Sequence, residues 1–157
     1  GAFNALKLRP RRTIVFVGFS GEEYGLWGSK FYAEFPVIPL SKTIAMVNLD
    51  MIGRLGNRAI SVSHSDFVPE LEPMIKRSGA ELNSKIDVHL MGPREPSDHS
   101  VFHSRQIPSV HLFAGFHADY HTPADTADKL TFAGVVSISR LAAVLVWRIA
   151  EEGLHLN

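Results

Sequence analysis

The sequence predicts an α/β fold, a three-layer sandwich in which helices cover a mixed, mostly parallel sheet. Short apolar, β-rich runs alternate along the chain with segments whose apolar residues recur at helical spacing. Several of these runs are apolar throughout, which is typical of strands covered on both faces. A length of 157 residues with 45% apolar residues suffices for one domain with a buried core.

The first predicted elements are a strand, a helix and a second strand. Residues 11–19 are β-rich and continuously apolar after Thr13, so we expect a central strand there. Residues 24–35 show helical spacing, and Pro36 ends that helix because proline cannot continue it. Residues 43–52 form another apolar run and predict a second buried strand.

Three shorter elements follow. Residues 59–63 predict a short strand. Residues 67–78 predict a helix with Gly79 as its stop. Residues 86–90 alternate only weakly between polar and apolar side chains, which favours an edge strand.

The last third of the chain completes the pattern. We expect a short helix over residues 98–104, capped by Ser97, and a buried strand over residues 108–113. Residues 115–128 are rich in Gly, His, Asp and Pro and predict a loop. Residues 132–151 predict a long apolar helix.

Composition narrows the classes of function. The formal net charge is zero, which argues against a nucleic acid or an anionic membrane as partner. Charges interrupt the apolar stretches within about a dozen residues, so we expect none to span a bilayer. With no cysteine and eight histidines, any metal must be held by histidine and carboxylate side chains.

Two adjacent acids, Glu22 and Glu23, follow the first predicted strand across a Gly-Phe-Ser-Gly turn. Ligands bind at the carboxyl edge of open α/β sheets, where this turn is expected. Neighbouring carboxylates repel each other there, and a metal ion would compensate, with one glutamate as ligand and the other as base. Helix capping by the same acids is the structural alternative.

Two further side chains are expected at the same edge. Asp50 lies late in the second strand, and His121 lies in the loop after the strand over residues 108–113. If these strands are parallel neighbours, Glu23, Asp50 and His121 converge, and this donor set suits Zn²⁺. Each residue taken alone is explained as well by a capping acid or a solvated loop histidine.

The remaining histidines allow several interpretations. His99 and His103 lie about one helical turn apart and could chelate a metal, although a capped helix explains them equally. His111 lies inside an apolar strand, which favours a buried core histidine over a metal ligand. Three alternating loop residues form another candidate group, of which we expect one ligand: His117, Asp119 and His121.

Four motifs in order resemble one known family. They are Phe-Ser-Gly-Glu-Glu-x-Gly-Leu-x-Gly-Ser at 19–29, Asn-Leu-Asp-Met-Ile-Gly at 48–53, Ser-Asp-His at 97–99 and Asp-Tyr-His-Thr-Pro-x-Asp-Thr at 119–126. Together they resemble the co-catalytic zinc aminopeptidases of metallopeptidase family twenty-eight. The resemblance runs from about Arg11 to the final helix.

The resemblance implies a role for each matching residue. Glu22 is the general base, Glu23 is a zinc ligand shared in one site with His121, and Asp50 binds the other zinc. It also implies two Zn²⁺ ions in a complete domain, a peptide substrate with a free N-terminus, and water as the nucleophile. Members are often secreted or periplasmic, so the same location is expected here.

One part of the family pattern is missing. In the family, a His-x-Asp motif and a bridging aspartate precede the Glu-Glu pair, whereas residues 1–10 contain no His, Asp or Glu. We therefore expect residues 1–157 to be the C-terminal portion of a catalytic domain that lacks its N-terminal strands. Alone, it should bind one Zn²⁺ or none and be weakly active.

Three other interpretations stay open. The turn around Ser20 is a near miss to the Gly-x-Ser-x-Gly nucleophile elbow, which would make the chain a serine hydrolase with Asp50 or Asp98 and His121. A mononuclear site could instead use other histidines, namely His117, His99 or His103. A non-catalytic half-domain would associate with another chain or itself through an exposed sheet edge.

Overall fold

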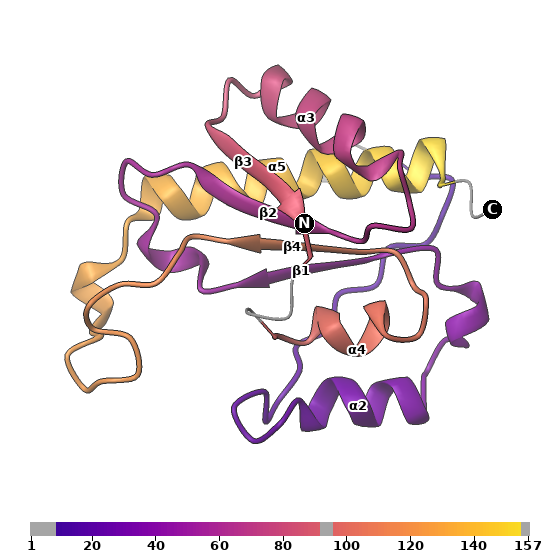
Figure 1. Ribbon diagram of the computed structural model, residues 1–157, viewed down its shortest axis with the longest axis horizontal. Helices are drawn as coiled ribbons and strands as arrows, with labels where there is room; N and C mark the ends of the chain where they lie inside the picture. The colour runs from indigo at the N-terminus through magenta and orange to yellow at the C-terminus, as the bar shows by residue number, and fades with distance from the viewer. Residues whose placement is uncertain (1–8, 92–95, 155–157) are drawn as a thin grey trace.

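The computed structural model describes residues 9–91 and 96–154, and these contain one four-stranded sheet (Figure 1). The strands are β1 (Met46–Asp50), β2 (Ile60–His64), β3 (Ile86–Leu90) and β4 (Ser109–Phe113), in the spatial order β1-β4-β2-β3. β1 pairs with β4 and β2 with β3 in parallel, whereas β2 and β4 are antiparallel. The predicted mixed, mostly parallel α/β fold is confirmed, with β3 at the edge.

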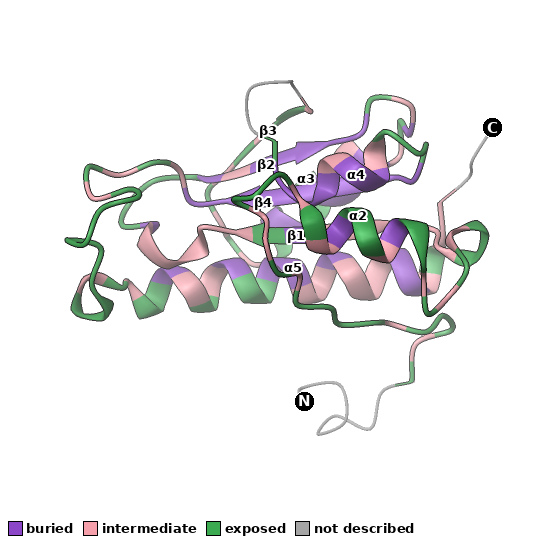
Figure 2. Cartoon of the chain, turned by 90° about the horizontal axis from the view of Figure 1, so that it is seen from below, coloured by how far each residue is buried: buried purple, intermediate pink, exposed green. Residues whose placement is uncertain are grey.

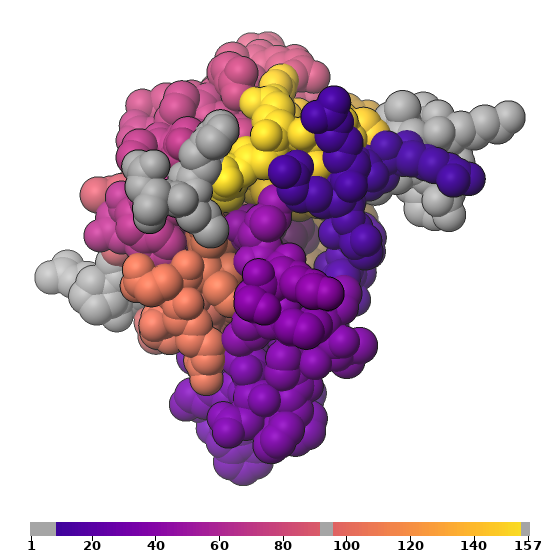
Figure 3. Space-filling view, turned by 90° about the vertical axis from the view of Figure 1, so that its right-hand side faces the viewer, coloured from indigo at the N-terminus to yellow at the C-terminus, as the bar shows by residue number. Residues whose placement is uncertain are grey.

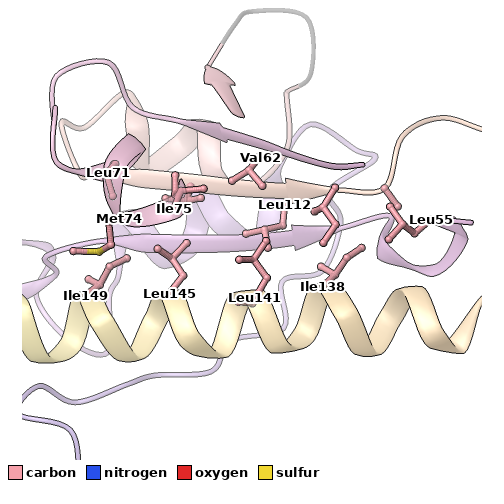
Figure 4. Packing of buried hydrophobic residues seen from close by; sticks show 14 of the residues in the cluster. Leu55, Val62, Leu71, Met74, Ile75, Leu112, Ile138, Leu141, Leu145 and Ile149 are labelled. Carbon is pink, nitrogen blue, oxygen red and sulfur yellow. The ribbon is translucent and has the colours of Figure 1, made fainter. Parts of the chain in front are cut away.

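One face of the sheet is covered by α3 (Leu71–Glu81) and α5 (Phe132–Glu152). Figure 4 shows a row of α5 side chains pointing at the sheet, formed by Ile138, Leu141, Leu145 and Ile149. This row follows the helical spacing of the sequence, and all four side chains are buried. They meet Val62 and Leu112 from the strands, so this face holds the larger part of the core.

Helix α5 differs from one expectation. By length and composition alone it could cross a membrane, whereas the sequence pattern predicted no apolar stretch long enough to span a bilayer. The apolar stripe of α5 packs against the sheet. The helix also contains two arginine side chains, Arg140 and Arg148, among its apolar residues.

The opposite face is covered by two smaller helices, α4 (His99–His103) and α2 (Trp27–Glu34). Val101 and Phe102 of α4 are buried in a second apolar cluster together with Ala33 of α2. α2 ends before Pro36, as predicted, and Figure 2 shows that its outer face is exposed. The site described below lies where the turn before α2 meets the carboxyl end of β1.

Residues 11–19 were predicted as a central strand, and this prediction is wrong. The segment forms no strand, and Phe16 is 84% exposed. An apolar, β-rich run becomes a strand only when a neighbouring strand pairs with its backbone, and none does so among the described residues. The segment is held at its ends, where Arg12 donates to the carbonyl of Ala150 at 3.0 Å and Phe19 packs on Phe102. In Figure 3 indigo atoms from the N-terminal part of the chain lie against yellow atoms from its C-terminal part.

Two predicted helix boundaries are also corrected. α3 continues through Gly79 to Glu81, and Gly79 lets the helix approach β3, since a Cβ there would lie 2.5 Å from Cδ1 of Ile86. Ser97 does not cap α4, because its hydroxyl bonds to Asp50 instead.

The outer edge of β1 is open in the part of the chain that the structure describes, since β4 is its one strand neighbour there. An open edge exposes backbone groups that another strand can pair with. Self-association through this edge stays a prediction.

Candidate active site

The turn that carries Glu22 and Glu23 is folded against the start of α2. The amide of Leu26 donates to the carbonyl of Glu22 at 2.8 Å, and the amide of Gly28 donates to the carbonyl of Ser20 at 2.8 Å. Gly28 is required for this approach, because a Cβ there would lie 2.5 Å from the Ser20 carbonyl oxygen. The position of both carboxylates thus depends on a backbone contact that any side chain at Gly28 would disturb.

Gly28→Ala should destabilise the protein by about 1–3 kcal/mol, because the added methyl group meets rigid backbone and overpacks the turn. Thermal unfolding measures the effect. Gly18→Ala is the matched control, since a Cβ at Gly18 meets nothing within 4 Å. Equal melting temperatures for the two variants would contradict the close approach described above.

Asp50 is the last residue of β1, and its carboxylate is held by a chain of polar side chains. The hydroxyl of Ser97 donates to Oδ2 of Asp50 at 2.8 Å. Nδ2 of Asn48 in turn donates to the Ser97 hydroxyl at 2.9 Å. Because Asn48 and Ser97 are buried, this chain fixes the orientation of the Asp50 carboxylate.

His121 lies in the loop between β4 and α5, which follows β4 at the edge where β1 also ends. Its Nε2 donates to Oε1 of Glu23 at 2.7 Å, across 98 positions of sequence. The ring stacks on Tyr120 with 3.7 Å between centroids. His121 has a φ of 54°, a left-handed conformation that is uncommon for residues other than glycine.

The electrostatics of Glu22 show that the acids lie near one another. Burial raises the pKa of Glu22 most, followed by the negative charges of Glu23, Asp50 and Asp98, while His121 opposes the shift. The predicted edge therefore gathers Glu22, Glu23 and His121, with Asp50 close enough to act on the Glu22 carboxyl. Within residues 9–91 and 96–154, no three His, Asp or Glu side chains form a group that could hold a metal ion.

Asp98, considered from the sequence only as a partner of Ser20 in a serine hydrolase, is a further candidate at this edge. It is 8% exposed, burial raises its pKa, and its Oδ1 has no hydrogen-bond partner among the described residues. A buried carboxylate oxygen without a partner is unusual in proteins and marks Asp98 as a residue to test. The Ser-Asp-His motif at 97–99 was the signal in the sequence.

The remaining histidines do not join this group. His99 and His103 point to different partners: His99 stacks on His111 with 4.3 Å between centroids, and Nδ1 of His103 contacts the Ser65 hydroxyl at 2.8 Å. His111 is a buried core residue, as expected, and Nδ1 of its ring accepts from Asn48 at 3.1 Å.

Two alternatives lose support from this geometry. His117 lies 3.7 Å from Asp125, so of the alternating loop residues it is His121 that faces the glutamates. No hydrogen bond joins the Ser20 hydroxyl to His121 or an aspartate in the described parts of the chain, and the preceding segment is not a strand. The turn at Ser20 therefore lacks the strand and the base that a nucleophile elbow needs.

Two known proteins are similar to this chain in sequence. Leupeptin-inactivating enzyme 1 of Streptomyces exfoliatus is 34% identical over 123 residues, which are 78% of this chain and 27% of that protein. The probable glutamate carboxypeptidase VP8 of Zea mays is 27% identical, over 92% of this chain and 23% of its own length. The chain thus spans about a quarter of the length of these relatives.

Solved structures show the same fold. An aminopeptidase from Aneurinibacillus sp. strain AM-1 superposes with a TM-score of 0.72 and 27% identity, over 88% of this chain and 34% of that one. LapB from Legionella pneumophila superposes with a TM-score of 0.77 and 21% identity, over 94% and 42% of the two chains.

The family model described as peptidase family M28 matches residues 2–146. That span includes the turn before α2, the end of β1, the start of α4 and the loop after β4, which are the four segments that build the site. With nearly the whole chain matched and every motif of the site inside the match, this chain belongs to peptidase family M28.

Proposed function

We propose that the chain carries active-site residues of a zinc-dependent aminopeptidase, with Glu22 as general base and Glu23, Asp50 and His121 as zinc ligands. The contact of 2.7 Å between Glu23 and His121, beside the perturbed Glu22, is the observation that carries the proposal. The names of two similar proteins support it, since one is an aminopeptidase and the other inactivates leupeptin.

The side chains present fit zinc by their donor chemistry. Zinc binds imidazole nitrogen and carboxylate oxygen, and one atom of each kind already meets between His121 and Glu23. Asp50 supplies a further carboxylate whose orientation is fixed by Ser97. Three carboxylates acting on Glu22 against one imidazole leave an excess of negative charge that a divalent cation would neutralise.

Glu22 is suited to move a proton. Its pKa is raised, first by burial and then by the neighbouring acids, which brings the carboxyl nearer to the pH at which it can both accept and donate. The carboxylate takes a proton from the attacking water and returns it to the amide nitrogen of the leaving peptide. When bound, zinc would supply a lowered water pKa and a polarised carbonyl oxygen. No covalent intermediate with the protein is required.

The charges of the site favour a substrate with a free N-terminus. An α-ammonium group is attracted to the negative charge that Glu22, Glu23, Asp50 and Asp98 keep beyond what one divalent cation neutralises, whereas a C-terminal carboxylate is not. Beside His121, three aromatic rings follow one another with centroid separations of 5.1 and 5.0 Å and form an apolar wall: Phe113, Phe116 and Tyr120.

The test compares a short peptide carrying a free N-terminus with its N-acetylated form, using the natural full-length protein. We expect the free peptide to be cleaved at least about a hundredfold faster, because the acetylated peptide lacks the ammonium charge that the acids attract. A chelator should abolish cleavage and added Zn²⁺ restore it, while Ser20→Ala should leave it intact. Equal cleavage of both peptides, or cleavage that survives chelation, would overturn the proposal.

A further inference from the structure

We propose that Arg54 is a positioning residue, which holds the His121 loop against the carboxyl end of β1 by pairing with two loop carboxylates, Asp119 and Asp125. The inference rests on the proposed function, because it assigns Arg54 a role in presenting His121. It concerns a residue outside the Glu22, Glu23, Asp50 and His121 set.

The two ion pairs come from one guanidinium group. Nη2 of Arg54 lies 2.7 Å from Oδ2 of Asp119, and Nη1 lies 2.6 Å from Oδ1 of Asp125. The Arg54 side chain is 18% exposed, so the pairs are partly shielded from water. A planar guanidinium presents nitrogen atoms in a fixed fork and can serve two carboxylates at once, which an ammonium group on a flexible stem cannot do with the same geometry.

The ends of this contact lie next to the proposed ligands. Arg54 closes the short helix η2 (Ile52–Arg54), which begins two residues after Asp50. Asp119 and Asp125 lie two residues before and four residues after His121. The Arg54 side chain therefore ties the segment after Asp50 to the loop on both sides of His121.

The loop needs such support because of its backbone. His121 has a φ of 54°, a left-handed conformation that is strained at a residue other than glycine. The loop folds as consecutive turns, in which the amide of Thr122 donates to the carbonyl of Asp119 at 3.0 Å and the amide of Asp125 donates to the carbonyl of Thr122 at 3.1 Å. Since Arg54 binds the residues that open and close this pair of turns, it fixes where His121 points.

A second arginine reinforces the first. Nη2 of Arg58 donates to the carbonyl of Arg54 at 2.6 Å, and Nη1 donates to the carbonyl of Phe116 at 3.0 Å, at the start of the loop. Lys129 adds a contact of 2.9 Å to Asp119. The loop is thus tied to the segment after β1 mainly by charged side chains, with Arg54 at the centre.

A positioning role of Arg54 and a structural role predict different effects on stability and on metal affinity when Arg54 is replaced. Ion pairs near the surface contribute little to stability, so the loss of Arg54 should leave the fold intact. Residues that orient a metal ligand, in contrast, typically change metal affinity about 10–100-fold when replaced. Metal affinity should therefore fall much more than the melting temperature.

The experiment uses the natural full-length protein and Zn²⁺ in competition with a chromophoric chelator. Arg54→Gln should weaken Zn²⁺ binding about tenfold or more, and Arg54→Lys should recover part of the loss, because it keeps the charge but not the fork. The matched control is Arg77→Gln, which removes a surface arginine paired with Glu152 at 2.9 Å. The metal-free melting temperatures of Arg54→Gln and Arg77→Gln should agree within a few degrees.

A double-mutant cycle tests whether Arg54 acts through the loop. In the background Asp119→Asn with Asp125→Asn, replacing Arg54 by Gln should change Zn²⁺ affinity little further, since the partners are already neutral. Unchanged affinity in Arg54→Gln, or an effect that persists fully in the double-Asn background, would overturn the inference. If His121→Ala also leaves Zn²⁺ affinity unchanged, the proposed function fails; if His121→Ala weakens it and Arg54→Gln does not, the Arg54 role alone fails.

Discussion

Glu22→Gln should lower the turnover number of the natural full-length protein by about 10²–10⁴-fold, the usual contribution of a general base. Glutamine keeps the size of the side chain but cannot take a proton from water at neutral pH. Because Glu22 is proposed as a base and not as a ligand, Zn²⁺ content should stay that of the wild type. Steady-state kinetics together with metal analysis of the same preparations measure both quantities.

The matched control for this variant is Glu34→Gln, which makes the same chemical change at the exposed C-terminal end of α2. It should keep wild-type turnover. Retained turnover in Glu22→Gln would remove Glu22 from its proposed role. A loss of Zn²⁺ from the same variant would instead make Glu22 a ligand.

Acid should unfold this protein by charging two buried histidines. Burial lowers the pKa of His99 from 6.5 to about 3, with smaller contributions from His111 and His103, and burial lowers the pKa of His111 to about 4. In the unfolded chain both rings return to their ordinary pKa, so the unfolded state binds protons at a higher pH than the folded state does. Stability is therefore complete above pH 6.5 and is lost as the pH falls toward 4 and then 3.

The expected loss is large compared with the stability of a typical domain. Each ring contributes roughly 1.4 kcal/mol per pH unit between 6.5 and its own folded-state pKa, or about 3–5 kcal/mol per ring, against a typical free energy of unfolding of about 5–15 kcal/mol. Denaturant unfolding of metal-free protein at several pH values measures the slope. His111→Gln should reduce this slope by one proton. Equal slopes for the wild type and His111→Gln would contradict the buried, neutral state of His111.

Most of the regular structure followed from hydrophobic pattern and turn residues. The strands β2, β3 and β4 lie within a residue of their predicted bounds, and α5 extends one residue beyond its predicted end. These elements bury their apolar side chains against one another, so their pattern and their packing agree. Residues 11–19 carry an equally strong pattern and fail, because a strand also needs a neighbour that no local signal describes.

The sequence likewise predicted part of the candidate site, namely its residues, but not the contacts between them. The acids at 22 and 23, Asp50 and His121 were selected from their types and their places after predicted strands. The hydrogen bond from Ser97 to Asp50 spans 47 positions, and the pair between Arg54 and Asp119 spans 65. Sequence spacing carries no information on such contacts, because loop paths and side-chain directions decide them.

The amino-acid sequence by itself determined the α/β class, the order of most elements, and the residue types from which a His and carboxylate site can be made. Only the tertiary structure decided that His121 meets Glu23, that the His99 and His111 rings stack in the interior, and that Arg54 ties the loop to the end of β1. The physical reason is that periodicity reports which face of an element is buried, whereas sheet order and loop conformation decide which distant side chains come within bonding distance.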